Sequence, residues 1–196
     1  MRNFQSRPDF IERKEWVSEE EPVTVAEVKS QLRFVFDNED ALIGGYIASA
    51  RDRCEAELNR KLRRQRAELT YSAWGTGLRL DRMGHDVVIE SITYVDTAGA
   101  TQTLPSTDYR IKKEHLLLVL PASGKDWPAL NCEEPTIVVT LQAGCAAAAD
   151  VPRPVKNWIM AVAASMFRSR ESHSDKTMTE LEFIGGLLDD YRINIV

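Results

Sequence analysis

Residues 21–62 read EPVTVAEVKSQLRFVFDNEDALIGGYIASARDRCEAELNRKL and contain the signals of two consecutive helices. Thr24 and Glu27 have the spacing of a capping box, in which each side chain accepts a hydrogen bond from the other residue's free backbone N–H. The first helix is therefore predicted to begin after Thr24 and to run from about Val25 to Phe34.

The second predicted helix is longer. Asp37 or Asn38 caps it, and it runs to about Leu62. Gly44 and Gly45 weaken this helix by about 1 kcal/mol each relative to alanine, which indicates either close packing of a neighbour or a bend. The apolar side chains recur at spacings of three and four, which places them on one helical face. They are Ile43, Ile47, Ala50, Cys54 and Leu58.

Residues 64–144 differ from the rest of the chain, because they consist of short β-branched or aromatic runs separated by turn residues. They predict a small antiparallel β domain of about six strands, with one hairpin turning at Asp96 to Gly99. Before the first helix, residues 1–21 show no sustained periodicity and are expected to form an extended or mobile arm.

Helix returns after the run from Ala146 to Ala149, where Asp150 can cap and Pro152 and Pro154 suit a first helical turn. Thr179 and Glu182 form a second capping box that opens a short helix. The inward stripe of the third helix is Val155, Trp158, Ile159, Val162 and Met166. The expected fold class is α+β: a core of about four helices, with the β domain inserted between the second and third. The expected segments are 1–21, 22–63, 64–144, 145–190 and the tail 191–196.

Composition excludes several classes. The 196 residues are 43% hydrophobic and 28% charged, which is ordinary for a globular protein with a buried core. Asp and Glu total 30 against 25 for Lys and Arg, whereas a free-standing nucleic-acid binder normally carries a positive balance. No apolar run approaches the ~18 residues of a membrane span, and the charged N-terminus resembles neither a signal peptide nor an anchor. Three widely spaced cysteines predict no disulfide framework and a reducing compartment.

No catalytic, cofactor or metal constellation is found, so the expectation is a protein that is not an enzyme. His85, His115 and His173 lie in separate turn or loop settings without metal-ligand spacing. Phosphate-binding and nucleophile-elbow motifs are absent. Asp189 and Asp190 are adjacent on a predicted helix and point apart, so they are expected to be surface groups rather than a paired acid–base site.

Two surface features remain. The basic residues are expected to contact acidic segments of a neighbouring subunit, with nucleic-acid phosphates as the alternative. These candidates are Arg60, Lys61, Arg63, Arg64, Arg153 and Lys156. The chain ends in apolar residues of high β propensity, which either dock on their own domain or add a strand or plug to another protein. This tail is Tyr191, Arg192, Ile193, Asn194, Ile195 and Val196.

In the order and spacing of several short segments, the sequence resembles those of the head–tail connector (adaptor) proteins of long-tailed bacteriophages, prophages and gene-transfer particles. The resemblance covers about residues 21–192. The segments that show the resemblance are residues 21–29 with Leu32-Arg33, 37–43 leading into 48–51, 89–104, Tyr109-Arg-Ile, Trp127-Pro128, 138–144, 151–156 and 167–171.

The resemblance implies a structural virion protein of the neck, made in the host bacterial cytoplasm. Family members form a ring that matches a twelve-fold portal, join it to the stopper or tail, and leave a channel for double-stranded DNA without sequence-specific binding. The C-terminal segment typically reaches into the portal, which here corresponds to Tyr191 to Val196. The alternative is a nucleic-acid-binding module acting in DNA packaging, and a third is an enzyme hidden in the β domain.

Overall fold

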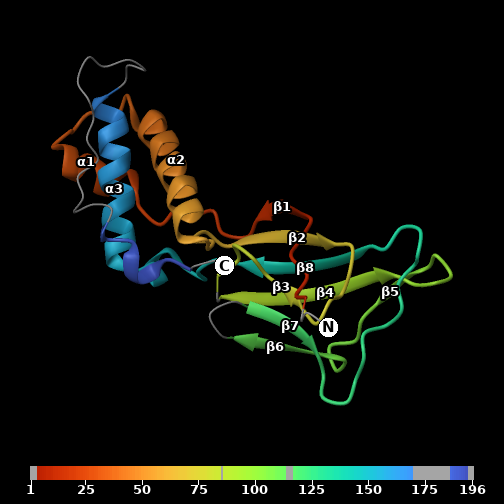
Figure 1. Cartoon of the computed structure of the whole chain (residues 1–196). Helices are drawn as coiled ribbons and strands as arrows, with labels where there is room; N and C mark the ends of the chain where they lie inside the picture. Colours follow the sequence, from red (N-terminus) through yellow and green to blue (C-terminus); the bar gives the residue numbers. More distant parts are fainter. Residues whose placement is uncertain (1–3, 85, 114–116, 170–185, 194–196) are drawn as a thin grey trace. The chain divides into compact units, whose positions relative to one another are not determined.

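A computed structural model describes residues 4–84, 86–113, 117–169 and 186–193 (Figure 1). The chain divides into two units. The β unit comprises Met1–Val17, Arg64–Gly144 and Ile193–Val196, and the helical unit comprises Ser18–Arg63 and Cys145–Arg192.

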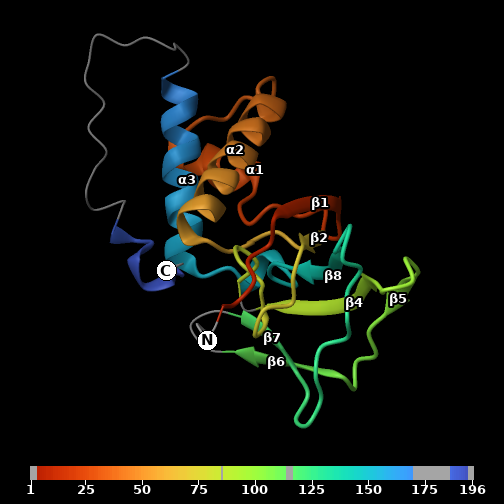
Figure 2. The same ribbon diagram turned by 45° about the vertical axis from the view of Figure 1, so that its right-hand side comes forward.

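The helical unit contains α1 (Val25–Leu32), α2 (Asp40–Leu58) and α3 (Arg153–Arg168), with single 3-10 turns at Ala148–Asp150 and Asp189–Tyr191. Figures 1 and 2 both show α2 and α3 side by side and running in opposite directions.

The predicted capping box of α1 is confirmed. The Glu27 N–H donates to Thr24 Oγ1 over 3.2 Å, and the Thr24 N–H donates to Glu27 Oε2 over 2.8 Å. The hydrogen bond from the Thr24 backbone is the main cause that lowers the pKa of Glu27, and the charges of Lys156 and Arg153 lower it further. Helix α1 ends earlier than predicted because Arg33 has the left-handed φ of 54°.

The predicted start of α2 is wrong by one or two residues, since Glu39 rather than Asp37 or Asn38 occupies the N-cap. Its predicted apolar face is confirmed, because Ile43, Ile47, Ala50, Cys54 and Leu58 are all buried. In α3, Val155, Trp158 and Ile159 are buried and Val162 packs against the same core.

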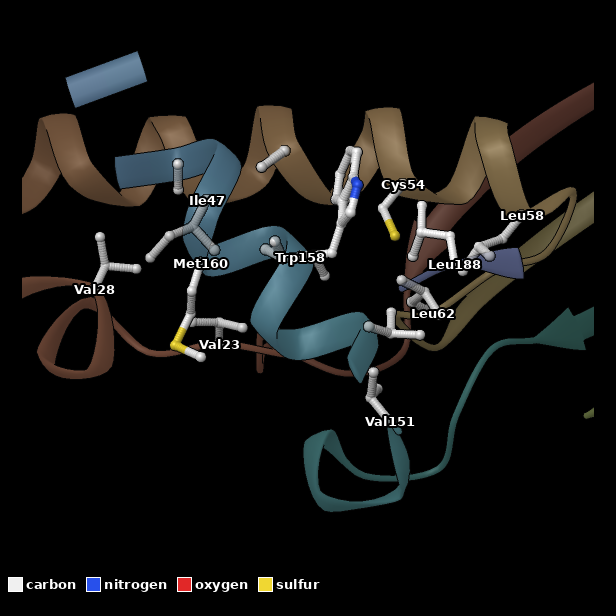
Figure 3. Packing of buried hydrophobic residues seen from close by; sticks show 14 of the residues in the cluster. Val23, Val28, Ile47, Cys54, Leu58, Leu62, Val151, Trp158, Met160 and Leu188 are labelled. Carbon is white, nitrogen blue, oxygen red and sulfur yellow. The ribbon is translucent and has the colours of Figure 1, made fainter. Parts of the chain in front are cut away.

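Trp158 lies at the centre of this core. Figure 3 shows its ring reaching from α3 towards α2, beside Cys54. The Cys54 thiol is buried, and this burial raises its pKa to about 12. Cys54 is therefore a packing residue rather than a reactive thiolate, as its place in the apolar stripe predicted.

The β unit contains eight strands among its described residues. They are β1 (Phe10–Trp16), β2 (Gln65–Tyr71), β3 (Leu78–Arg79), β4 (Val87–Val95), β5 (Thr101–Thr103), β6 (Tyr109–Lys113), β7 (Leu117–Pro121) and β8 (Ile137–Ala143). They form two antiparallel sheets with the orders β1-β2-β8-β4-β5 and β3-β7-β6. The predicted hairpin at Asp96 to Gly99 is confirmed as the β4–β5 turn, where the Asp96 carboxylate accepts from Ala98 N–H and Ala100 N–H.

The predicted fold class is wrong. The described residues form three α-helices and eight strands in two sheets, not a core of about four helices with a small inserted β domain. The fourth helix was predicted from Thr179, and most of it lies outside the described residues. The β part is also larger than expected, because the segment assigned to an extended or mobile arm contains β1.

Strand β1 was not predicted from the sequence, because four of its seven residues are charged and only Ile11 and Trp16 are partly buried. Its stability comes from β2, which is distant in sequence. Lys14 Nζ lies 3.0 Å from Glu68 Oε2, and Arg66 Nη1 lies 3.5 Å from Glu15 Oε1. A charged edge strand of this kind also discourages pairing with a further sheet.

A buried ion network joins the ends of Ser18–Arg63. Arg51, only 2% exposed, donates from Nε and Nη2 to the Glu21 carboxylate over 3.0 and 3.2 Å. Arg63 donates to the same carboxylate over 2.9 Å and to the Ser18 carbonyl over 2.8 Å. Burial opposes the charge of Arg51, but the hydrogen bonds and charge of Glu21 outweigh it and raise the Arg51 pKa.

Glu55 extends this network to the chain that leaves α2. Its Oε1 accepts from the Leu62 N–H over 2.9 Å and from the Arg63 N–H over 3.3 Å, and its Oε2 lies 3.3 Å from Lys61 Nζ. The Cys145 N–H in turn donates to the Leu62 carbonyl over 3.1 Å. Hydrogen bonds therefore link the chain segments at Ser18, at Leu62 and Arg63, and at Cys145.

Replacing Glu55 with leucine should lower the free energy of unfolding by about 3 kcal/mol, because buried donors lose their acceptor. Urea denaturation measures this. Glu57→Leu is the matched control on the same helix. It removes half-exposed ion pairs with Arg53 and Arg192 and should cost less than about 1 kcal/mol. Equal losses for the two variants would contradict the role of the network.

The two glycines of α2 have no packing reason within the described part of the chain. A Cβ added at Gly44 or Gly45 would meet no heavy atom within 4 Å, and α2 continues unbroken through both. Gly45→Ala should therefore raise the free energy of unfolding by about 1 kcal/mol, since alanine has the better helix propensity. A destabilised Gly45→Ala variant in thermal or urea denaturation would show that a neighbouring group fills this space.

Candidate functional site

The described residues contain no cluster of three or more His, Cys, Asp or Glu side chains that could hold a metal ion. Among the helices of those residues, none is both long and apolar enough for a transmembrane span. All three histidines lie outside the described residues. The candidate functional features found among the described residues are surfaces.

At least three of the six predicted contact residues form hydrogen bonds or ion pairs within the chain. Arg63 bonds to Glu21 and Lys61 to Glu55 in the helical unit. Arg64 belongs to the β unit, where it donates to the Gln142 side-chain oxygen over 3.3 Å and to the Gly144 carbonyl over 3.1 Å. These three cations hold the fold together.

The remaining candidates lie at helix ends. Arg60 is half-buried directly after α2. Arg153 is exposed at the first position of α3, and Lys156 is half-buried one turn later. Arg153 and Lys156 both lie close enough to Glu27 to lower its pKa. Their contact with a neighbouring subunit stays a prediction.

The tail is described as far as Ile193. Tyr191 is half-buried and packs against the core of the helical unit, whereas Arg192 is exposed. Arg192 Nη2 lies 3.7 Å from Glu57 Oε2 and Arg192 Nη1 4.0 Å from Asp189 Oδ1. Asn194, Ile195 and Val196 lie outside the described residues, so docking on the portal stays a prediction for them.

The sequence analysis missed an exposed apolar surface at one end of the helical unit. Val35 is 78% exposed, Phe36 65%, and Leu42 is also exposed; these three residues are called the hydrophobic tip below. The tip rests on Phe34, whose ring centroid lies 5.6 Å from that of Phe36 and 5.2 Å from that of Phe167. The available signal was the run Phe34-Val35-Phe36 directly before the predicted cap.

The second predicted helix, α2, also has a solvent-facing side with few long polar residues. Opposite its buried face, α2 exposes Leu42, Gly45, Ser49 and Ala56, and Asp52 and Arg53 are the exposed charged residues on this side. Solvated helix faces normally carry charged and long polar side chains along their whole length. This side of α2 is continuous with the hydrophobic tip through Leu42.

Comparison with solved structures finds the same fold in particle necks. One chain is from the neck of an empty GTA particle computed with C6 symmetry, with a TM-score of 0.78 and 18% identity, covering 95% of this chain and 97% of that one. Another is from the neck of a native GTA particle computed with C12 symmetry, with a TM-score of 0.74, 18% identity and coverages of 95% and 97%. A third, from the virion of a native gene transfer agent particle, has a TM-score of 0.74, 18% identity and coverages of 95% and 96%. Similarity at this level of identity establishes a shared fold.

Comparison with curated proteins finds no match. The family model of the phage gp6-like head-tail connector protein matches residues 22–94. This span contains the capping box of α1, all of α2 and the network residues Arg51, Glu55 and Arg63. The resemblance found in the sequence is thereby confirmed: residues 22–94 are similar to the phage gp6-like head-tail connector protein family, and the neck structures share the fold over 95% of the chain.

Proposed function

We propose that this chain is a structural connector of a virion neck, which forms a ring under the portal and joins the capsid to the stopper or tail. The observation that carries the proposal is the head-tail connector match at residues 22–94, together with a fold that covers 97% of a GTA neck chain. The C6 and C12 symmetries of the similar neck structures support a ring of identical copies, with twelve as the expected number.

In this proposal the connector acts mechanically and is not an enzyme. Genomic double-stranded DNA passes through the channel without sequence-specific binding. The net charge of -5 suits that role, because a surface that repels phosphates lets DNA slide rather than adhere.

The alternative, a nucleic-acid-binding module in DNA packaging, depends on the basic stretch from Arg60 to Arg66 and on the basic helix from Arg153 to Arg170. Lys61, Arg63 and Arg64 in that stretch already bond within the chain. They do not form a free row of cations for a phosphate backbone, so the connector is the better supported function.

Mixing the purified protein with portal rings should give a complex that co-sediments, with twelve copies around the portal axis in negative-stain images. The protein alone should not shift duplex DNA at low salt. A protein that stays monomeric with portal rings and never sediments with them would contradict the connector, and a salt-sensitive shift of duplex DNA would favour the alternative.

The tail from Tyr191 to Val196 is proposed to dock on the portal. Deleting residues 193–196 should abolish co-sedimentation with portal rings, because this segment is proposed to bind the portal, and should leave the thermal midpoint nearly unchanged. Replacing Ile193, Ile195 and Val196 together with serine keeps the chain length and should have the same effect. A large loss of thermal stability would instead show that the tail serves its own chain.

A further inference from the structure

The proposed ring requires a contact between copies, and α2 offers one side of it. The face of α2 opposite Ile43 and Ile47 is exposed, and its residues Gly45, Ser49 and Ala56 project little. The hydrophobic tip meets this face at Leu42, and its other two residues, Val35 and Phe36, precede the start of the helix. Because side chains set the distance between packed helices, such a face allows a second helix to approach closely.

The outer face of α3 has a matching character. Opposite the buried Val155 and Ile159, α3 presents Arg153, Asn157 and Arg168 as exposed residues, with Ala161 and Ser165 half-buried between them. The chain contains no acidic residue from position 151 to 170. This face therefore has a small centre and basic ends.

Two acidic residues lie beside the α2 face, which also carries the exposed Arg53. Asp37 lies next to the hydrophobic tip, and Asp52 lies towards the other end of α2; their side chains are 87% and 61% exposed. Asp37 already pairs with Lys29 and Asp52 with Arg51. Each carboxylate has four lone-pair sites, so both can accept a further cation.

Two contacts within the chain show which positions along α2 lie level with which positions along α3. The rings of Phe34 and Phe167 meet at one end, and the Arg53 guanidinium lies 5.8 Å from the Trp158 ring centroid nearer the other. Asp37 and Arg168 therefore both lie towards one end of the helix pair, whereas Asp52 lies near the level of Trp158, more than one helical turn from Arg153. A second copy in the same orientation brings opposite charges together at the Asp37 and Arg168 end.

We propose that the outer face of α2, with the hydrophobic tip, packs against the outer face of α3 of the next copy in the ring. This inference rests on the ring of the proposed function and names the surfaces that build it. The two surfaces are different, so the contact is heterologous, and heterologous contacts close into a ring when the rotation between copies allows it.

Disulfide cross-linking tests this pairing. Ser49 lies one turn before Arg53 and Ala161 about one turn after Trp158, so the two residues are level on their helices. In a Cys132→Ser background, the double variant Ser49→Cys, Ala161→Cys should form a ladder of linked multimers with portal rings under mild oxidation. Each single variant should remain monomeric on a non-reducing gel. Dimers of Ser49→Cys alone, or disulfides only within one chain, would overturn the proposal.

Bulk placed on the α2 face gives an independent test. Gly45→Lys should keep or raise the thermal midpoint, because its Cβ meets no neighbour, while reducing ring assembly on the portal at least tenfold. Thr101→Lys is the matched control, since it adds the same charge at an exposed position of β5 and should assemble normally.

These outcomes separate the two proposals. If the wild type and both lysine variants assemble equally well, the α2–α3 contact is wrong and the connector function stands. If the wild type forms no ring on the portal, both proposals fail.

Discussion

The fold of the helical unit depends on the carboxylate of Glu21, which is shared by two guanidinium groups. Arg51 approaches it from within α2, and Arg63 approaches it from the end of the same chain segment. Breaking a buried ion pair on one side costs far more than an exposed pair contributes. Glu55 completes the arrangement by accepting from the backbone at Leu62 and Arg63. These contacts thus fix helix α2 to the segment before α1, which contains Glu21, and to the segment after α2, which contains Leu62 and Arg63.

This arrangement changes the meaning of the basic stretch after α2. Viewed along the sequence, Arg60 to Arg66 is a row of cations suited to phosphates or to an acidic partner. In the structure, Arg63 binds Glu21 and Arg64 belongs to the β unit, where it binds Gln142 and Gly144. A cluster in sequence is divided between two units in space. Local charge density is therefore a poor guide to this protein's contacts, and the identity of each partner decides the role of each cation.

The sequence predicted features whose signals are local. The Thr24–Glu27 box, the apolar faces of α2 and α3 and the Asp96–Gly99 turn each depend on residues a few positions apart. Strand β1 was missed because its partner β2 lies some fifty residues later and its own residues are mostly charged. The network around Glu21 joins residues up to 45 positions apart, beyond any periodic pattern. The function was predicted from the family resemblance, because a surface that binds another protein has no catalytic motif by which the sequence could identify it.

The glycines of α2 lower the stability of the helix, and the proposed contact between copies gives them a role in assembly. Natural sequences are consistent across levels, and places that break a local rule without compensation within the chain are expected at functional sites. Gly45 breaks the rule of helix propensity, and no described neighbour uses the space that it leaves. The exposed Val35, Phe36 and Leu42 break the rule of burial at the adjoining end of the same face. The proposed contact with a second copy gives these two departures one common explanation, since Leu42 joins the outer side of α2 to the hydrophobic tip.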